Sequence, residues 1–353
     1  MWIVTLLLFI FILGLIVLVH EFGHFIWAKH FKVYIYEFSI GMGPVIYTHK
    51  GKDKIDYNIR AFPIGGFVSM AGEVYADDNK VKKDSLLCNK PWYARLIILV
   101  AGVVNNFILA IVLLFAFAAI WGRTPIKPTI SEVIKDYPVE KAGIVAGDTI
   151  TKINNHKVSS WDTAQILLYY KNDKSYYTFE IVHKDKTKDT YKITPVKEKD
   201  EETKEERNVF GFTISSTGKD KGFFSSLTYA FQKFKSVVDS MLLTLKGLFT
   251  GKISVHALSG PVGIYKVVDE GKKAGLASII YIIAFLSMNV GVINILPFPA
   301  FDGGRVLFLI IEKIKGSPVN SKLENAFHTV GFILLMLLMI YITYRDILKI
   351  FVK

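Results

Sequence analysis

The chain has 353 residues, of which 51% are hydrophobic, and a formal net charge of +12 at pH 7. Its mean hydropathy of +0.35 is high for a soluble globular protein, and the apolar residues gather in a few blocks separated by charged stretches. The expected class is therefore a polytopic membrane protein with a soluble insertion, and the single cysteine, Cys88, excludes an internal disulfide framework. No nucleic-acid-binding pattern accompanies the lysines, so we expect no nucleic-acid partner.

The first apolar block runs almost unbroken from Trp2 to Val19 and continues to Trp27. That length predicts a transmembrane helix within residues 1–27. A cleaved signal peptide is the alternative, but the usual positive amino-terminal region and a small-residue cleavage site are missing from this block.

Residues 28–92 predict a mixed region at the membrane surface or partly inside the membrane. Within it, residues 57–70 carry strand-forming Tyr, Ile, Phe and Val around Pro63 and two glycines, which predicts a β-hairpin turned at the glycines. Irregular backbone at membrane depth needs cover from protein or from a water-filled cavity. The next apolar block, residues 93–122, predicts the second transmembrane helix.

A polar insertion follows the second span. Residues 123–210 alternate strand, turn and helix signals, which predicts a small α+β domain; its charge run at 196–208 is expected to be a solvated loop. Residues 211–274 contain an amphipathic helix at 223–249, expected to lie in the membrane interface. Burial of this helix against the soluble domain is the alternative.

Two further apolar blocks complete the chain. Residues 275–304 predict a third span that prolines interrupt near its end, and residues 305–353 predict a loop followed by a fourth span. The fold class is thus a polytopic α-helical membrane protein with about four transmembrane helices, a membrane-associated β-hairpin and an inserted α+β domain. Lys and Arg gather in residues 28–95 and 304–327, so the positive-inside rule places both segments in the cytoplasm and the insertion outside.

The first span contains the sequence HEFGH, with His20, Glu21 and His24. A charge at that depth costs about 2.5–3.5 kcal/mol, so these residues need a function that offsets the cost. Residues four apart share one helix face, which lets His20 and His24 bind one zinc ion while Glu21 reaches a zinc-activated water as general base. With only 8 histidines in the chain a chance HExxH match is rare.

A catalytic zinc needs a third protein ligand, and the third apolar block offers Asp302 in NILPFPAFDGGR. Pro297 and Pro299 are expected to unwind the helix there and display Asp302 and Asn294 from irregular backbone. Taken alone, Asp302 would read as a helix cap in a turn. Three other acidic residues have no comparable context: Glu37, Glu73 and Asp269.

HEFGH in the first span together with NILPFPAFDGG in the third resembles the site-2 proteases, the intramembrane zinc metalloproteases, and most of all their bacterial regulator-of-sigma-E protease branch. The family pattern is HExxH followed much later by N-x-x-P-x-P-x-L-D-G, and the resemblance extends over essentially the whole chain. It implies that His20, His24 and Asp302 bind one catalytic Zn²⁺ and that Glu21 is the general base. It also implies that Asn294 engages the scissile segment.

Two other segments resemble the family more loosely. AGVVNNFILA is similar to an A-G-P-x-x-N-F element, which places a family asparagine at Asn106 as a further substrate contact, and SGPVGIY is similar to S-G-P-x-G. Val103 stands where the family usually has proline, and Phe301 where it usually has leucine; neither change removes a ligand. Residues 140–158 resemble the core segment of a PDZ domain, which implies either a peptide-binding edge or an inert spacer.

The resemblance implies hydrolysis of peptide bonds inside transmembrane segments of single-span proteins, of the anti-sigma-factor or remnant-signal-peptide type. It implies a multi-pass protein in the lipid bilayer of a bacterial cytoplasmic membrane, with the active site near the cytoplasmic side and the PDZ-like domain outside. A helical substrate hides its carbonyls in internal hydrogen bonds and must unwind before attack. We expect a strand edge at Gly66 and Phe67 to hold the unwound segment.

Two rival functions are weaker. A proteolytically inactive peptide-binding relative would lack a ligand or the glutamate, and all four residues are present. A metal transporter would more often repeat its polar motifs in the two halves of the chain, and no such repeat is found.

Overall fold

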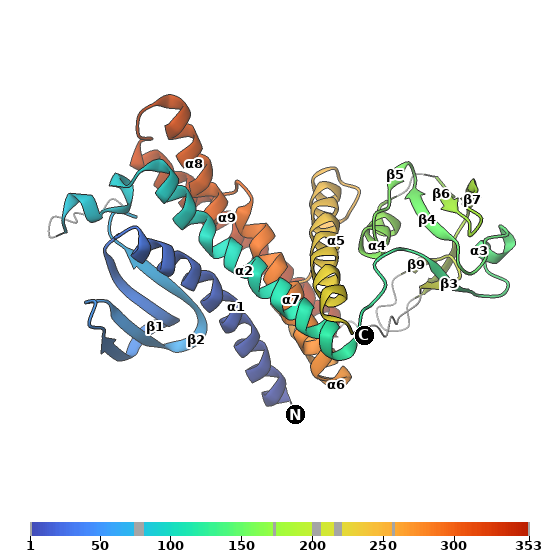
Figure 1. Ribbon diagram of the computed structural model, residues 1–353, viewed down its shortest axis with the longest axis horizontal. Helices are drawn as coiled ribbons and strands as arrows, with labels where there is room; N and C mark the ends of the chain where they lie inside the picture. Colours follow the sequence, from blue (N-terminus) through green and yellow to red (C-terminus); the bar gives the residue numbers. More distant parts are fainter. Residues whose placement is uncertain are drawn as a thin grey trace. The chain divides into compact units, whose positions relative to one another are not determined.

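The computed structural model describes residues 2–73, 81–171, 174–199, 206–214, 221–255 and 258–351. The chain forms two compact units. Unit 1 comprises Met1–Leu113 and Ser259–Lys353, and unit 2 comprises Leu114–Leu258. Figure 1 follows the chain through the elements of both units.

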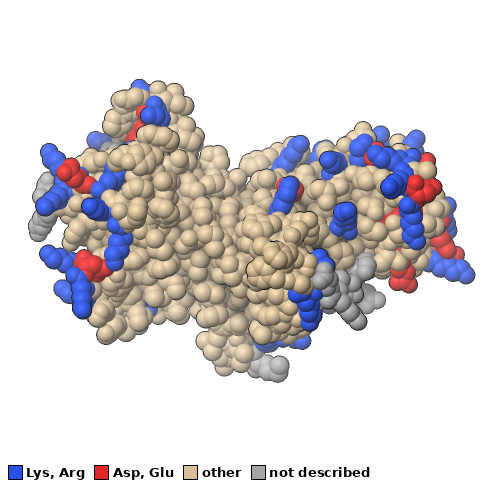
Figure 2. Space-filling model, viewed as in Figure 1, with Lys and Arg blue, Asp and Glu red and all other residues tan. Residues whose placement is uncertain are grey.

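Four helices among the described residues are long and apolar enough to cross a membrane, as predicted. They are α1 (Trp2–His30), α2 (Trp92–Trp121), α7 (Leu276–Ile295) and α9 (Ser321–Phe351). Many large apolar side chains on α1 and α9 are exposed, as lipid-facing surfaces require. On the face shown in Figure 2, charged side chains are sparse over the long helices of unit 1 and gather elsewhere in unit 1 and over unit 2.

The helices of unit 1 pack through aliphatic side chains. Ile12 and Ile16 of α1 are fully buried with Val268 of α6 (Pro261–Ala274) and with Ile282 and Ile283 of α7. Ridges of branched side chains at helical spacing give this kind of close helix contact. Helix α6 thus packs against both the first and the third span.

The carboxylate of Asp346 on α9 binds the amino-terminal end of α6. Its Oδ2 accepts the backbone N–H groups of Gly260 and Gly263 at 2.9 and 3.0 Å, and the side chain is buried. A negative charge is favourable at a helix amino terminus, and a Cβ on Gly260 would lie 3.1 Å from that oxygen. The glycines of the SGPVG segment therefore let the Asp346 carboxylate come close enough to accept both backbone N–H groups.

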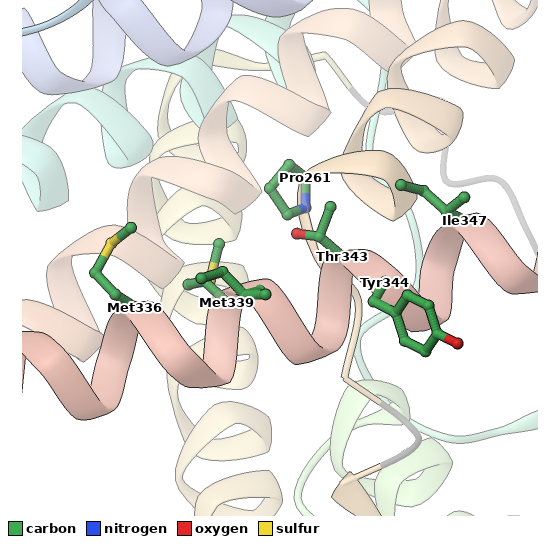
Figure 3. Close-up of a pocket in the computed structure, with 7 residues that line it drawn as sticks. Pro261, Met336, Met339, Thr343, Tyr344 and Ile347 are labelled. Carbon is green, nitrogen blue, oxygen red and sulfur yellow. The ribbon is translucent and has the colours of Figure 1, made fainter.

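Beside this cap, Pro261 and one face of α9 line an apolar groove with a cavity volume of about 510 Å³, which Figure 3 shows in close-up. The groove residues on α9 are Met336, Met339, Ile340, Thr343, Tyr344 and Ile347.

Unit 1 also contains an antiparallel sheet of β1 (Ile35–Lys50) and β2 (Asp56–Met70). The hairpin predicted within residues 57–70 was wrong in its pairing, because residues 57–59 and 66–70 do not pair with each other. Phe38 pairs with both Tyr57 and Val68, so the two halves of β2 lie on opposite sides of β1. Gly65, with φ +81°, bends β2 instead of turning a hairpin.

The sheet packs on the last turns of α1. Phe25 and Ala28 of α1 form a buried cluster with Phe38 of β1 and Val68 of β2. The bend of β2 reaches the middle of the first span, where the Pro63 carbonyl oxygen lies 3.4 Å from the Cβ position of Gly14. Helix α1 therefore covers backbone that could not otherwise lie at membrane depth. Figure 1 shows both strands beside α1.

Helix α7 ends at Ile295, and a separate helix, α8 (Asp302–Lys315), begins at the predicted ligand. The prolines stand between the two helices because they cannot donate the backbone hydrogen bonds of a continuous helix. Two short 3₁₀ turns, η1 (Lys83–Ser85) and η2 (Leu87–Asn89), precede α2.

Unit 2 has a four-stranded sheet in the order β5-β4-β6-β7, formed by β4 (Thr149–Ile153), β5 (His156–Lys157), β6 (Tyr177–Val182) and β7 (Lys188–Ile193). A second pair joins β3 (Ile130–Val133) to β10 (Phe212–Ile214), and two helices, α3 (Pro138–Lys141) and α4 (Trp161–Tyr169), complete the α+β arrangement. The charge run is not a plain loop: β8 (Val196–Lys199) pairs with β9 (Glu206–Val209), while residues 200–205 lie outside the described part.

The buried Asp148 stands at the loop before β4, within residues 140–158. Its Oδ2 accepts the backbone N–H of Val145 at 3.0 Å and lies 2.9 Å from Nδ1 of His183. The hydrogen bond to Asp148 raises the pKa of His183, because the carboxylate stabilises the protonated ring.

The predicted amphipathic helix is α5 (Phe223–Phe249), and it packs on α4 through its polar face. Lys233 is buried and donates to both carboxylate oxygens of Asp162 at 2.8 Å each. By contrast, the apolar Phe231 and Leu242 are 54% and 51% exposed. The helix thus contacts its own domain and still presents apolar side chains outward.

We predict that Lys233→Met destabilises unit 2 by about 1–3 kcal/mol, because it leaves the half-buried Asp162 carboxylate without its cation and, among the described contacts, with only Ser236 as a donor from α5. Lys235→Met is the matched control: Lys235 pairs with Asp239 on the same helix, but its side chain is 73% exposed. Its removal should cost less than about 0.5 kcal/mol. Amide hydrogen exchange of α4 and β4 in the full chain measures both effects, and equal protection in the two variants would contradict the prediction.

Candidate metal centre

His20 and His24 lie one turn apart on α1, both only 6% exposed, with their Nε2 atoms 3.2 Å apart. Helix α2 crosses α1 at this point with almost no space between the backbones. A Cβ on Gly23 would lie 2.4 Å from the Ala101 carbonyl oxygen, and a Cβ on Gly102 would lie 2.4 Å from His24 Nε2. Because neither glycine has a side chain, the two helices can approach closely and the imidazole rings fit between them.

A backbone carbonyl fixes the tautomer of His24. Its Nδ1 donates to the carbonyl oxygen of Ile98 at 2.7 Å, and a carbonyl oxygen can only accept. In the neutral ring the lone pair is therefore on Nε2, the nitrogen that faces His20. This is the usual arrangement of a metal-binding histidine.

Asn106 supports the second ring. It is fully buried on α2, and its carboxamide Nδ2 lies 3.2 Å from His20 Nδ1. The two ends of a carboxamide have the same shape, so a half-turn about χ2 presents its oxygen to the ring instead. The oxygen would accept the Nδ1 proton of His20 and leave Nε2 free for a metal.

Asp302 completes the group from α8. Its Oδ2 lies 2.9 Å from His20 Nε2 and 3.4 Å from His24 Nε2. The residue stands in the first turn of its helix, where the helix dipole favours a negative charge. The structure thus brings together the three side chains that the sequence singled out as metal ligands, from elements almost 280 residues apart.

The residues fit a zinc ion. All three donor atoms lie within 4.8 Å of one another, and nitrogen ligands at the usual zinc distance in a tetrahedron are about 3.3 Å apart. Asp302 Oδ2 is buried and accepts no hydrogen bond from the described residues. With neutral rings, two imidazole lone pairs and a carboxylate oxygen face one another, an arrangement that repels unless a cation lies between them.

Glu21 lies next to this group. The side chain is half-buried and directly follows His20 in α1. Its helical position, about 100° from His20 around the axis, keeps it beside the ligand set instead of within it. That is the placement expected of a base that handles a proton near the metal.

Tight packing holds the segment before Asp302. A Cβ on Gly303 would lie 2.2 Å from the carbonyl oxygen of Leu296, so only glycine allows α8 to begin against the end of α7. Asn294, the predicted substrate residue, is half-buried in the last turn of α7.

The predicted strand-edge residues lie in β2. Gly66 pairs with Ile40 and Phe67 with Ser39, and the guanidinium of Arg60 stacks over the Phe67 ring at 4.9 Å. Among the described contacts, none joins Gly66, Phe67 or Asn294 to the three ligand side chains.

The three acidic residues that the sequence set aside each pair with a cation in the structure. Glu37 accepts from Arg60 at 2.9 and 3.0 Å, Glu73 pairs with Arg305, and Asp269 accepts from Lys272 at 3.1 Å. None of the three belongs to a metal-binding group among the described residues.

Sequence reasoning missed two supports of this site. The Ile98 carbonyl is a backbone group, so no residue type announces its role. Gly23 and Gly102 did have a signal, because Gly23 lies inside HEFGH and Gly102 lies inside AGVVNN, both within apolar spans. Glycine at such places often marks close backbone approach.

Comparison with known proteins agrees with this geometry. The profile described as Peptidase family M50 matches residues 8–338. A Fusobacterium nucleatum protein named "Putative zinc metalloprotease" is 38% identical, with 98% of this chain and 99% of that one aligned. A Clostridium acetobutylicum protein of the same name is 35% identical over 95% and 94%. "Zinc metalloprotease RasP" of Shouchella clausii is 32% identical over 98% and 99%.

We predict that Asn106→Leu weakens zinc binding about 10–100-fold, because His20 loses the group that orients its ring. Asn105→Leu is the matched control, since Asn105 donates to the Val19 carbonyl and does not touch His20. Chelator competition on the solubilised protein measures the zinc dissociation constant. Equal affinity in the two variants would show that the carboxamide of Asn106 does not act on the ligand.

Proposed function

As a member of peptidase family M50, the family of site-2 proteases, this chain is a zinc metalloprotease, and we propose that it cleaves peptide bonds inside the membrane. Its four apolar helices and bacterial relatives indicate a multi-pass bacterial membrane protein. The proposed substrates are transmembrane segments of single-span proteins, of the anti-sigma-factor or remnant-signal-peptide type. The observation that carries the proposal is the convergence of Asp302 of α8 with His20 and His24, which lie beside Glu21 on an apolar helix.

We propose that His20, His24 and Asp302 hold one Zn²⁺, leaving room for substrate and water. A zinc ion bound there would activate water and polarise the peptide carbonyl. The protein supplies two neutral imidazoles and one carboxylate, so the charge of the filled site is +1 and its burial costs less than that of a bare ion.

Glu21 is the proposed general base. Its carboxylate takes a proton from the attacking water as the water oxygen bonds to the peptide carbonyl carbon. When the carbon–nitrogen bond breaks, Glu21 gives the same proton to the leaving nitrogen. The glutamate therefore ends the cycle in its starting state, ready for the next water.

A helical substrate must be unwound to expose its carbonyl, and the β1–β2 sheet offers an edge for the unwound segment. Residues 66–70 pair with 35–40 on one side, and no other strand among the described residues pairs with them on the other. An extended peptide can add to such an edge through backbone hydrogen bonds, with Gly66 and Phe67 as contacts. Asn294 would bind the same segment near the scissile bond.

Charge distribution supports an orientation. The segments 28–95 and 304–327 are rich in Lys and Arg, and the positive-inside rule puts them in the cytoplasm. The active site would then open near the cytoplasmic side, with the PDZ-like domain outside. There the domain would bind peptide or exclude substrates with large outer domains.

Glu21→Gln is predicted to keep one zinc per chain while lowering cleavage of a reconstituted single-span substrate by about 10²–10⁴-fold, because an amide cannot take the proton. Metal content is read by mass spectrometry on the same preparation. The control is Glu270→Gln, an exposed glutamate of α6, which should match the wild type in both measurements. Cleavage at the wild-type rate by the Glu21→Gln protein would remove Glu21 from the base role.

Phe67→Pro is predicted to lower cleavage with zinc content unchanged, because proline removes a backbone donor from the proposed substrate edge. Ile46→Pro is the control on the opposite edge of the sheet, where residues 45–50 pair with 56–60. The expected outcome is selective loss in Phe67→Pro. Equal loss in both variants would mean that the sheet as a whole, and not this edge, is needed.

A further inference from the structure

The segment that carries Asp302 has an unfavourable backbone conformation. Ala300, two residues before the proposed ligand, has φ +69°, in the left-handed region that side chains with a Cβ rarely adopt. A residue keeps such a conformation only when its surroundings hold it there. The question is which contacts do so.

One contact comes from the fourth span, which contributes none of the proposed ligands. Nδ1 of His328 on α9 accepts the backbone N–H of Ala300 at 3.1 Å. In the neutral ring the proton is therefore on Nε2, which is buried without a hydrogen-bond partner among the described residues. A hydrocarbon side chain would avoid that unsatisfied donor, so the benefit of the histidine lies in its bond to Ala300.

The same face of α9 presses on the rest of the segment. A Cβ on Gly331, three residues after His328, would lie 1.9 Å from Cβ of Pro299. A Cβ on Gly304 would lie 3.1 Å from Cε1 of His328 and 2.5 Å from the Phe298 carbonyl oxygen. Backbone and ring are thus in direct contact, and a small movement of α9 would be transmitted to the segment.

Aromatic packing fixes the ring of His328. Its centroid lies 6.0 Å from that of Phe308 on α8 and 5.7 Å from that of Phe327, and the two phenylalanine rings are themselves 5.1 Å apart. Helix α8 begins with Asp302, so the ring is held by the helix whose first residue it helps to place.

We propose that His328 is a positioning residue for the metal centre: by accepting the Ala300 N–H it holds the 296–301 segment so that Asp302 faces His20 and His24. This inference rests on the proposed zinc site. The fourth span would then contribute to metal affinity although it supplies no ligand. The role is separate from the chemistry, because His328 touches neither the ligand atoms nor Glu21 among the described contacts.

The test compares His328→Asn with His328→Leu. The Asn oxygen, bonded to Cγ as Nδ1 is, can accept the same N–H, whereas Leu fills similar space without an acceptor. We expect His328→Leu to raise the zinc dissociation constant about tenfold or more and to shift the visible absorption of the Co²⁺-loaded protein. His328→Asn should restore both. Thr329→Val, an exposed neighbour on α9, is the control and should match the wild type.

His328→Gln keeps the comparison informative if the Leu variant does not fold. Its acceptor stands one bond farther from the backbone, so it should bind zinc more weakly than the Asn variant. Wild-type affinity and Co²⁺ absorption in His328→Leu, or equal losses in the Asn and Gln variants, would overturn the proposal. Failure of the zinc site itself has a different signature: the wild-type protein would then bind no zinc that depends on Asp302, as tested with Asp302→Ala.

Discussion

Three electron-pair donors that meet in a low-dielectric interior are the constraint on which this structure depends. The Ile98 carbonyl commits the lone pair of His24 to the side that faces His20 and Asp302. Without a cation between them, these groups would repel, and the repulsion is strong where water cannot screen it. Close packing holds this unfavourable arrangement in place. It occurs where α1 crosses α2 at Gly23, where α8 begins against the end of α7 at Gly303, and where α9 contacts Pro299 at Gly331. The arrangement becomes favourable when a metal ion binds.

A second constraint is that non-helical backbone at membrane depth must be covered by protein. The structure meets it twice. The bend of β2 lies against α1 at Gly14, and the proline-rich segment before Asp302 lies against α9 at Gly331. In both places a glycine on a long helix removes the side chain that would keep the backbones apart. Irregular segments can then expose backbone polar groups inside the apolar layer, whereas a regular helix bonds its own backbone groups internally.

The sequence predicted the helices and singled out the HExxH pair as proposed ligands, because both leave local signals. Apolar length marks the spans, and the i, i+4 spacing of His20 and His24 marks a metal site. It failed at the sheet, where Phe38 pairs with residues from two distant parts of β2, because strand pairing is non-local and the glycine looked like a turn. It also left open whether the 223–249 helix lies in the membrane interface or packs on the soluble domain. In the structure α5 packs on α4, where the buried Lys233 pairs with Asp162.

The distribution of cations separates Asp302, the proposed ligand, from the three acidic residues that the sequence set aside. Glu37 is neutralised by Arg60 and Asp269 by lysines of its own helix, so neither carries an uncompensated charge. Asp302 makes no ion pair with Lys or Arg among the described residues, and its Oδ2 lies 2.9 and 3.4 Å from the Nε2 atoms of His20 and His24. Burying a carboxylate in that state is costly unless a cation arrives from outside the chain. The lack of a Lys or Arg partner among the described residues therefore supports Asp302 as the proposed ligand of a bound ion.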